Sequence, residues 1–543
     1  MVFARRSTTL LAAIIASCAM VLSLTACTSD NKTVVDGQTT VTSNSAGGVA
    51  VFTPSDGITL NQQTPLNKWA KLVPDLAKAL ADAGFKKGDI NHTTSDSLDK
   101  QSRAIQDFVV DHLSNNTTDD SGIAIAPDNM TLLVAPVVEA DASTRQYGDY
   151  VSQNLSTNDV TDEGATSDGE SSEDDSSKDD SSNTESDSTA SDEQAQAVDR
   201  LVSSLKLAKE SGMHVVLLGN SIEGYKPDAF VKFSDAQTIG KLQAEKMVSK
   251  LKLDKASKDN PKYIEVLLPY TAVDEKGNAN DSTFAQEAFR GIWQVLGSYY
   301  QKGVVESPSG TLDGKSTEND WQAVAYDAAK EGSTAKVLDK RLAKTDGQST
   351  LTRIDGIITM NDYIASEVVK ELDDLGYTGS AADINPQITI SGIVGNITGK
   401  KDLSRDAVPD PIKSPENDNA NDSSSSDDDA DKDTSASDKD RDSQWPLVTG
   451  YGAYVSNIPS IVNGKQWMTG MEDRQTIATD IAQACAKLNK DEALNSMPSI
   501  RNSEVGGVKK IPTISEPLLA VSASNLKSAL IDPGYISLAD AGL

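Results

Sequence analysis

Polar and aromatic side chains follow several predicted strands of this sequence, at positions where a parallel-sheet protein holds small molecules. The candidates are Trp69, Asn220, Asp235, Asn280, Asn361, Asp362 and Tyr451. Planar amides and carboxylates can bridge neighbouring hydroxyl groups with paired hydrogen bonds. An aromatic face can cover the apolar C–H face of a sugar ring. These residue types therefore suit a small polyhydroxyl ligand that is bound without being chemically changed.

The same side chains also have purely structural interpretations. Asp235 could cap the helix that follows it, and Ser234 with Gln237 fits a capping box. Asn361 could cap the helix that begins "DYIASEV", and Trp69 could belong to the apolar face of its own helix. The sequence leaves both interpretations open for each of these residues.

The loops after the strands contain no complete catalytic motif. The stretch "SGTLDGKS" (309–316) is close to a phosphate-binding loop, but a serine stands where the first glycine belongs. In "GNSIEG" (219–224) the second glycine comes one residue too late for a nucleophile elbow. His92, His112 and His214 have no cysteine or second histidine at ligand spacing, which argues against a zinc site. We therefore expect no enzymatic activity, no cofactor and no metal.

The first residues have the pattern of an export signal. Two arginines precede the apolar stretch "TTLLAAIIASCAMVLSL", which is shorter than a membrane-spanning helix. The box "LTAC" that ends at Cys27 resembles a bacterial lipobox, in which the thiol carries a diacylglycerol; a signal peptide with a chance cysteine is the alternative. The sequence thus predicts a signal peptide (1–26), a lipidated, flexible tether (27–47) and a location on the extracytoplasmic face of the cell membrane.

The charge distribution excludes one class of partner and predicts two insertions. A net charge of -31 argues against nucleic acid, which needs a basic surface. Residues 162–193 contain 13 acidic residues and one lysine, and residues 416–442 contain 11 acidic and three basic residues. Such runs bury too little apolar surface to offset chain entropy. We expect disordered, solvated insertions over 154–195 and 402–443; calcium binding or phosphorylation is the functional alternative.

Strand and helix patterns alternate along the rest of the chain. Apolar runs such as "GGVAVFTP", "MTLLVAPVV", "MHVVLLG", "YIEVLLPY", "IDGIITM", "QITISGI" and "WPLVTG" indicate buried strands. Amphipathic stretches such as "LNKWAKLVPDLAKALADAGF" and "NDYIASEVVKELDDLG" indicate the helices between them. This alternation predicts an α/β fold with parallel sheets and right-handed crossovers.

Several longer stretches resemble one family of binding proteins. They are, in chain order, "SLDKQSRAIQDFV", "VKFSDAQTIGKLQAE", "FAQEAFRGIWQVL", "IDGIITMNDYIASEVV", "WPLVTGYGAYVSNIPSIVNGKQWMTGMEDRQTIA" and "GGVKKIPTISEPLLAVSASNLKSALIDPGYIS". They are similar to the xylose- and multiple-sugar-binding lipoproteins of ABC importers, which belong to the type I periplasmic binding proteins. The likeness covers roughly 47–543, apart from the acidic insertions.

The resemblance implies two doubly wound parallel-sheet lobes, joined by three crossings and a hinge around a central ligand cleft. The implied N-terminal lobe comprises 48–225 with a return over 453–495. The implied C-terminal lobe comprises 226–452 with a return over 496–543.

The resemblance also assigns site residues. Trp69 matches the family's first-loop aromatic, Asp235 its usual asparagine, and Asn361 with Asp362 its "ND" pair. At two positions the sequence departs from the family. Asn220 stands where the family has the arginine of an Asp-Arg pair. Tyr451 stands where the family has the glutamine of a Gln-Asp pair.

The expected function is therefore the capture of a monosaccharide or small sugar by an extracytoplasmic, lipid-anchored solute-binding protein. Its expected partners are the permease and ATPase subunits of an ABC importer, and we expect a monomer. The alternative is a ligand sensor with the same fold that signals to a membrane receptor. A secreted α/β enzyme would need a nucleophile–base pair that the sequence does not show.

Overall fold

A computed structural model describes most of the chain between residues 46 and 543 and two short strands before it. The described residues are 33–35, 38–40, 46–55, 65–115, 125–138, 144, 146–150, 153–156, 184–273, 280–328, 330–343, 351–381 and 443–543. The chain divides into two compact units, Met1–Asn44 and Ser45–Leu543. In the first unit, β1 (Thr33–Val35) pairs antiparallel with β2 (Gln38–Thr40), so part of the predicted tether forms a short hairpin. Cys27 and the predicted signal peptide lie outside the described residues.

The first sheet of the second unit has the strand order β4-β3-β5-β7-β9-β18-β17. Neighbouring strands are parallel except for β17, which is antiparallel to β18. The strands are β3 (Gly48–Pro54), β4 (Ile90–Ser95), β5 (Met130–Val134), β7 (His214–Leu218), β9 (Ala229–Val231), β17 (Ile500–Val505) and β18 (Val508–Ile514).

The second sheet repeats this plan with the order β12-β10-β14-β15-β16-β19. Here β19 is the antiparallel strand at the edge. The strands are β10 (Lys262–Val266), β12 (Val305–Glu306), β14 (Gly356–Ile358), β15 (Leu447–Tyr451), β16 (Met468–Met471) and β19 (Leu519–Ser522). In both sheets the first strand in sequence lies between the second and the third, which is the doubly wound order of flavodoxin-like sheets.

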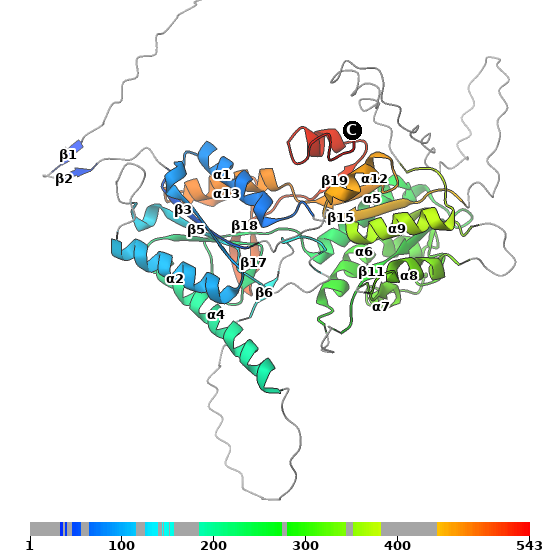
Figure 1. Ribbon diagram of the computed structural model, residues 1–543, viewed down its shortest axis with the longest axis horizontal. Coiled ribbons are helices and arrows are strands. Elements are labelled where there is room, and N and C mark those ends of the chain that lie inside the picture. The colour runs from blue at the N-terminus through cyan, green and yellow to red at the C-terminus, as the bar shows by residue number, and fades with distance from the viewer. Residues whose placement is uncertain are drawn as a thin grey trace, which may run out of the picture. The chain divides into compact units, whose positions relative to one another are not determined.

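Alternate residues of each strand of the first sheet enter different cores. Val49 and Val51 of β3 pack with α1 (Trp69–Asp82) and α13 (Arg474–Leu488). Ala50 and Phe52 pack with the helices on the other face, α2 (Leu98–Asn115) and α4 (Thr184–Glu210). Figure 1 shows these helix pairs on opposite sides of the sheet. Both faces of a parallel sheet must be covered, which explains why its central strands β3, β5 and β7 are apolar almost throughout.

The second sheet is covered in the same way. One face carries α5 (Ala236–Lys250) and α6 (Thr283–Gln301), and the other carries α8 (Ser333–Arg341) and α9 (Asp362–Leu375). The remaining described elements are short: β6 (Asn154–Leu155), β8 (Ser221–Ile222), β11 (Leu268–Pro269), β13 (Ala325–Tyr326), α7 (Trp321–Val324), α12 (Ile458–Val462), 3-10 turns Lys87–Asp89, Pro127–Asn129, Leu253–Lys255, Val455–Asn457 and Leu494–Ser496, and a π-helical turn Lys527–Ile531.

The predicted α/β fold of two doubly wound parallel-sheet lobes is confirmed, but the predicted lobe boundaries are wrong in detail. β9 belongs to the first sheet although the boundary was placed before it, and β16 belongs to the second. The tail also divides, since β17 and β18 extend the first sheet and β19 extends the second. Apolar strands look alike in sequence, so periodicity did not reveal which sheet each one joins.

The edges of the predicted insertions also differ from the structure. β6 and the start of α4 at Thr184 both lie within 154–195, which was expected to be disordered throughout. The segment 184–195 has seven Ser, Thr and Asp residues against five Glu, Gln and Ala, so helix propensity does not explain why α4 starts before the apolar periodicity begins. Residues 157–183 and 382–442, including the predicted strand "QITISGI", lie outside the described residues. Among the described helices, none combines the length and apolar character needed to cross a bilayer.

Candidate ligand site between the lobes

The described chain passes between the two lobes at three places. The crossings join β9 to α5, β16 to α13, and β18 to β19. All three follow the carboxyl ends of parallel strands, and the first two comprise residues 232–235 and 472–473. In parallel sheets these ends carry the ligand-binding loops. The crossings therefore place a small group of side chains from both lobes at one location.

A buried carboxylate joins the first two crossings. Glu472, which is 1% exposed, accepts hydrogen bonds through Oε1 from the backbone N–H of Ser234 (2.6 Å) and from the Ser234 hydroxyl. The hydroxyl of Tyr451, at the end of β15, lies 3.4 Å from the same oxygen and donates to it. Burial raises the pKa of Glu472 to about 7, although the donors from Ser234 and Tyr451 oppose the shift. The crossings thus share a carboxyl group that changes protonation near neutral pH.

Asn67, just before α1, extends this group into the first lobe. Its Oδ1 accepts a hydrogen bond from the backbone N–H of Glu472 (3.3 Å). Its Nδ2 is buried and has no hydrogen-bond partner among the described residues. The start of α1 is therefore tied to the second crossing, and one amide donor there remains available.

Two of the sequence-predicted site residues cap helices. Asp235 is the N-cap of α5, and its Oδ1 accepts from the backbone N–H (2.8 Å) and hydroxyl (2.6 Å) of Thr238. Burial raises the pKa of Asp235, but the Thr238 hydrogen bonds and the Lys232 ammonium outweigh it and hold this pKa below its ordinary value. Asn361 is the N-cap of α9 and accepts from the backbone N–H of Ile364 (2.9 Å). The capping interpretation of both residues is confirmed.

Three further predicted residues are buried in internal contacts. Trp69 is 2% exposed and packs edge-on against Tyr150, with ring centroids 5.0 Å apart. Asn220 donates to the carbonyl of Pro136 (2.9 Å) and accepts from the backbone N–H of Gln153 (3.0 Å). These contacts, like those of Tyr451, fix loops at the ends of strands.

Asp362 connects α9 to the loop after β15, to β16 and to the residues just before β16. Its two oxygens accept from Gln466 Nε2 (2.7 Å), the Thr469 hydroxyl (2.8 Å) and the backbone N–H of Tyr454 (2.9 Å). Burial raises the pKa of Asp362 to about 6, although these hydrogen-bond donors act to lower it. Its role in the described structure is to hold the loop that carries Tyr454.

Residues 146–150, here called the strap, bring several of these side chains together. Gln146 Oε1 accepts from Asn361 Nδ2 (3.0 Å), and Tyr147 lies 6.3 Å from Tyr451 between ring centroids. Sequence reasoning missed the strap. Its aromatic pair around a glycine, "QYGDY", was the available signal.

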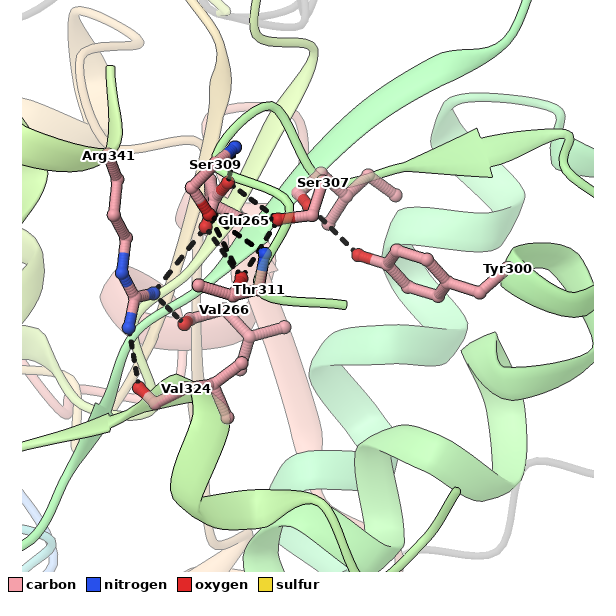
Figure 2. Close-up of polar contacts among 9 residues, drawn as sticks. Glu265, Val266, Tyr300, Ser307, Ser309, Thr311, Val324 and Arg341 are labelled. Atoms are coloured by element: carbon pink, nitrogen blue, oxygen red, sulfur yellow. Dashed lines mark hydrogen bonds and ion pairs between the residues drawn. The ribbon is translucent and has the colours of Figure 1, made fainter. Parts of the chain in front are cut away.

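A second buried carboxylate lies inside the C-terminal lobe (Figure 2). Glu265 of β10 is fully buried, and its Oε1 accepts from the Ser307 hydroxyl (2.7 Å) and the backbone N–H of Ser309 (2.9 Å). Arg341 of α8 lies 3.5 Å from Glu265 Oε2, and it also donates to the carbonyls of Val266 and Val324. The stretch that partly resembles a phosphate-binding loop is therefore anchored to the chain's own carboxylate. In the described part of the chain, no group of three or more His, Cys, Asp and Glu side chains is arranged to hold a metal ion.

No family model matches the chain, and no curated protein matches it in sequence. Solved structures do match it. One is an ABC transporter solute-binding protein from Clostridium phytofermentans with bound β-D-glucose, at 16% identity, 91% coverage of this chain, 99% of that chain and a TM-score of 0.44. Another is a carbohydrate transporter solute-binding protein from Chloroflexus aurantiacus in complex with D-glucose, at 18% identity, 92% and 98% coverage and a TM-score of 0.43. A third is a periplasmic ribose ABC transporter protein from Conexibacter woesei, at 14% identity, 90% and 96% coverage and a TM-score of 0.42.

Proposed function

We propose that this protein captures a sugar or a similar small polar ligand between its two lobes for an ABC importer. The observation that carries the proposal is the meeting of Ser234, Tyr451 and Glu472 with Asn67 at crossings between two doubly wound lobes. Lobes joined only by short crossings can close around a small molecule by a hinge motion. The family resemblance supports a sugar as the ligand. The permease and ATPase would be separate chains.

The ligand-binding residues remain part of this proposal, with different roles. Trp69, Asn361 and Tyr451 border the strap and would approach the ligand. Asn220 and Asp362 support the loops from behind. Asp235 caps α5, and none of the interactions described above joins it to the strap.

A thermal-shift screen of the purified protein against monosaccharides and short oligosaccharides tests the ligand class. A ligand at 100 times its dissociation constant stabilises a protein by about 2.7 kcal/mol. The expected result is an upward shift of the melting temperature by at least one sugar. A screen in which no carbohydrate changes the melting temperature would contradict the sugar and favour a sensor of another solute.

The proposal places the protein on the extracytoplasmic face of the membrane through a lipid on Cys27. A lipid contributes about 0.8 kcal/mol per buried CH₂, and two acyl chains anchor a protein stably where one does not. Cys27→Ser should therefore release the protein from the membrane fraction. Retention of the variant as firm as that of the parent would contradict the lipid anchor.

A further inference from the structure

The strap belongs to the hydrophobic cores of both lobes at once. Tyr147 packs in the core of the second lobe, where its ring lies 4.6 Å from that of Phe284 between centroids. Tyr150 packs in the core of the first lobe and stacks on Phe233 at 4.7 Å. Both side chains are 1% exposed. The lobes cannot separate fully while both rings keep these positions.

Gly148 allows this arrangement. Its φ is +101°, and a Cβ atom at this position would lie 2.5 Å from the carbonyl oxygen of Asn67. The backbone N–H of Asp149 donates to that same carbonyl (2.8 Å). A larger residue would therefore push the strap away from the start of α1.

Four oxygen atoms of the strap accept hydrogen bonds from both lobes, while the Asp149 N–H and the Tyr150 hydroxyl donate to the first lobe. Asp149 accepts from Lys68 Nζ (2.8 Å) through Oδ1 and from the backbone N–H of Trp69 (3.1 Å) through Oδ2. Across the interface, Gln146 accepts from Asn361 Nδ2 through its side chain and from the Tyr454 hydroxyl (2.7 Å) through its backbone carbonyl. Each of these four oxygen atoms faces a donor of the surrounding lobes.

These donors surround the position at which two lobes would enclose a ligand. We propose, building on the proposed function, that residues 146–150 occupy the solute position, and that a solute binds by displacing them and accepting hydrogen bonds from Lys68, Asn361 and Tyr454. The strap is then an internal competitor. The apparent affinity for the solute is reduced by the fraction of molecules in which the strap is in place.

The strap's own atoms indicate the chemical class of the solute. Removal of Asp149 leaves the Lys68 ammonium and the Trp69 N–H, at the start of α1, without their carboxylate. A carboxylate on the solute satisfies both donors and benefits from the adjacent helix terminus. Hydroxyl oxygens suffice for Asn361 and Tyr454. The best-fitting solute is therefore an oxygen-rich sugar acid rather than a neutral sugar.

Hydrogen exchange measured by mass spectrometry tests the displacement, with D-glucuronate and D-glucose as probes. Without solute, the amides of Tyr147 and Asp149 are hydrogen-bonded to Thr144 and Asn67 and should exchange slowly. With saturating D-glucuronate, residues 146–150 should exchange faster while the rest of the chain is protected. Binding that slows exchange in the strap would overturn the displacement and leave the solute-binding function intact.

Calorimetric titration tests the preference for an acid. D-glucuronate should bind at least about tenfold more tightly than D-glucose, since a charge-assisted hydrogen bond is roughly twice as strong as a neutral one. Lys68→Met should remove this preference. Lys71→Met, at an exposed position of the same helix, should retain it. Equal affinities for the two probes in the parent would overturn the assignment of a sugar acid.

Tyr147→Ala tests the strap by hydrogen exchange without a probe and, separately, by the binding of D-glucuronate. Loss of this ring from the second lobe should speed exchange both in the strap and around Tyr454, and should tighten D-glucuronate binding at least about tenfold. Tyr225→Ala is the matched control, because Tyr225 is also buried, at 3% exposure, in a different core of the first lobe. If Tyr147→Ala leaves exchange around Tyr454 unchanged, the strap does not hold the lobes. If exchange rises but neither sugar binds, the strap stands and the proposed function fails.

Discussion

Two fully buried carboxylates, Glu265 and Glu472, are held in different ways. Glu265 lies within one lobe and is paired with Arg341, at 3.5 Å. Glu472 lies where two crossings meet and is held by hydroxyl and amide donors, and the charged group that acts on it is the like-charged Asp235. Burial without a counter-charge favours the neutral form of a carboxyl group, and this is the situation of Glu472. The first carboxylate therefore suits a fixed loop and the second suits a region that rearranges.

The surroundings of the two groups agree with this difference. The loop held by Glu265 has a ring of hydroxyl contacts among Ser307, Ser309 and Thr311, with distances between 2.9 and 3.1 Å. The strap near Glu472 is instead held by several contacts that come from both lobes. An anchor inside one lobe is unaffected by lobe movement, but an anchor across two lobes must break when they separate.

The largest effect is expected from removal of the counter-charge within the C-terminal lobe. Arg341→Met leaves Glu265 buried and unpaired, which typically costs about 3–5 kcal/mol of unfolding free energy. Urea unfolding at neutral pH measures the loss. Adding Glu265→Gln in the same chain should recover a large part of it, because the uncompensated charge is then gone. A single variant as stable as the parent would show that the ion pair does not fix this lobe.

A pH-dependent effect is expected from Glu472, which has no such counter-charge. The native pKa of about 7 exceeds the ordinary value of 4.5, so the native state holds more protons than the unfolded state between these pH values. The free energy of unfolding therefore falls as pH rises from about 4.5 through 7. A shift of this size corresponds to at most about 3 kcal/mol.

Glu472→Gln should remove this fall, because an amide does not titrate. Urea unfolding of parent and variant between pH 4.5 and 8.5 gives the comparison, with the exposed Glu504→Gln as control. Asp362, whose native pKa is about 6 against an ordinary 3.8, should add a similar fall at lower pH that Asp362→Asn removes. A stability difference between parent and Glu472→Gln that is constant across this range would refute the interpretation.

Strands and helix caps, which depend on neighbouring residues, could be read from the sequence. Contacts between segments far apart in the chain could not. Apolar runs identified most strands, and the residue types at two predicted helix starts offered caps at Asp235 and Asn361 as one of two interpretations. The strap could not be predicted in this way. Gln146 meets Asn361 and Tyr454 at separations of 215 and 308 residues, and no local pattern encodes such partners.

The same limit applies to the ionisable groups. Glu472 looked like any other acidic residue in the sequence, because its pKa depends on burial and on Ser234, at a separation of 238 residues. Tyr451 was predicted from its position after a strand, but the direction of its hydroxyl toward Glu472 followed only from the fold. Positions at strand ends are thus predictable, whereas their partners are not.

The smallest effect is expected at Asp235, which is partly exposed and paired with Lys232 at 2.9 Å. Asp235→Ala removes the N-cap of α5 and should cost about 1 kcal/mol of unfolding free energy. The exposed ion pair adds little to this. Asp235→Asn is the matched control, since asparagine caps as well as aspartate and lacks only the charge.

Ligand binding distinguishes this cap from a contact with the solute. The hydrogen bonds and the ion pair of the Asp235 carboxylate are with its own segment, at Thr238 and Lys232. Asp235→Ala should therefore lower the melting temperature slightly with and without a solute and preserve the shift between them. The measurement is a thermal unfolding curve with and without the best sugar from the screen. If the variant melts as the parent does but shows no shift with the sugar, Asp235 contacts the solute directly. In that case the partly exposed Asp235 carboxylate, and not the buried Glu472, is the acidic group between the lobes that contacts the ligand.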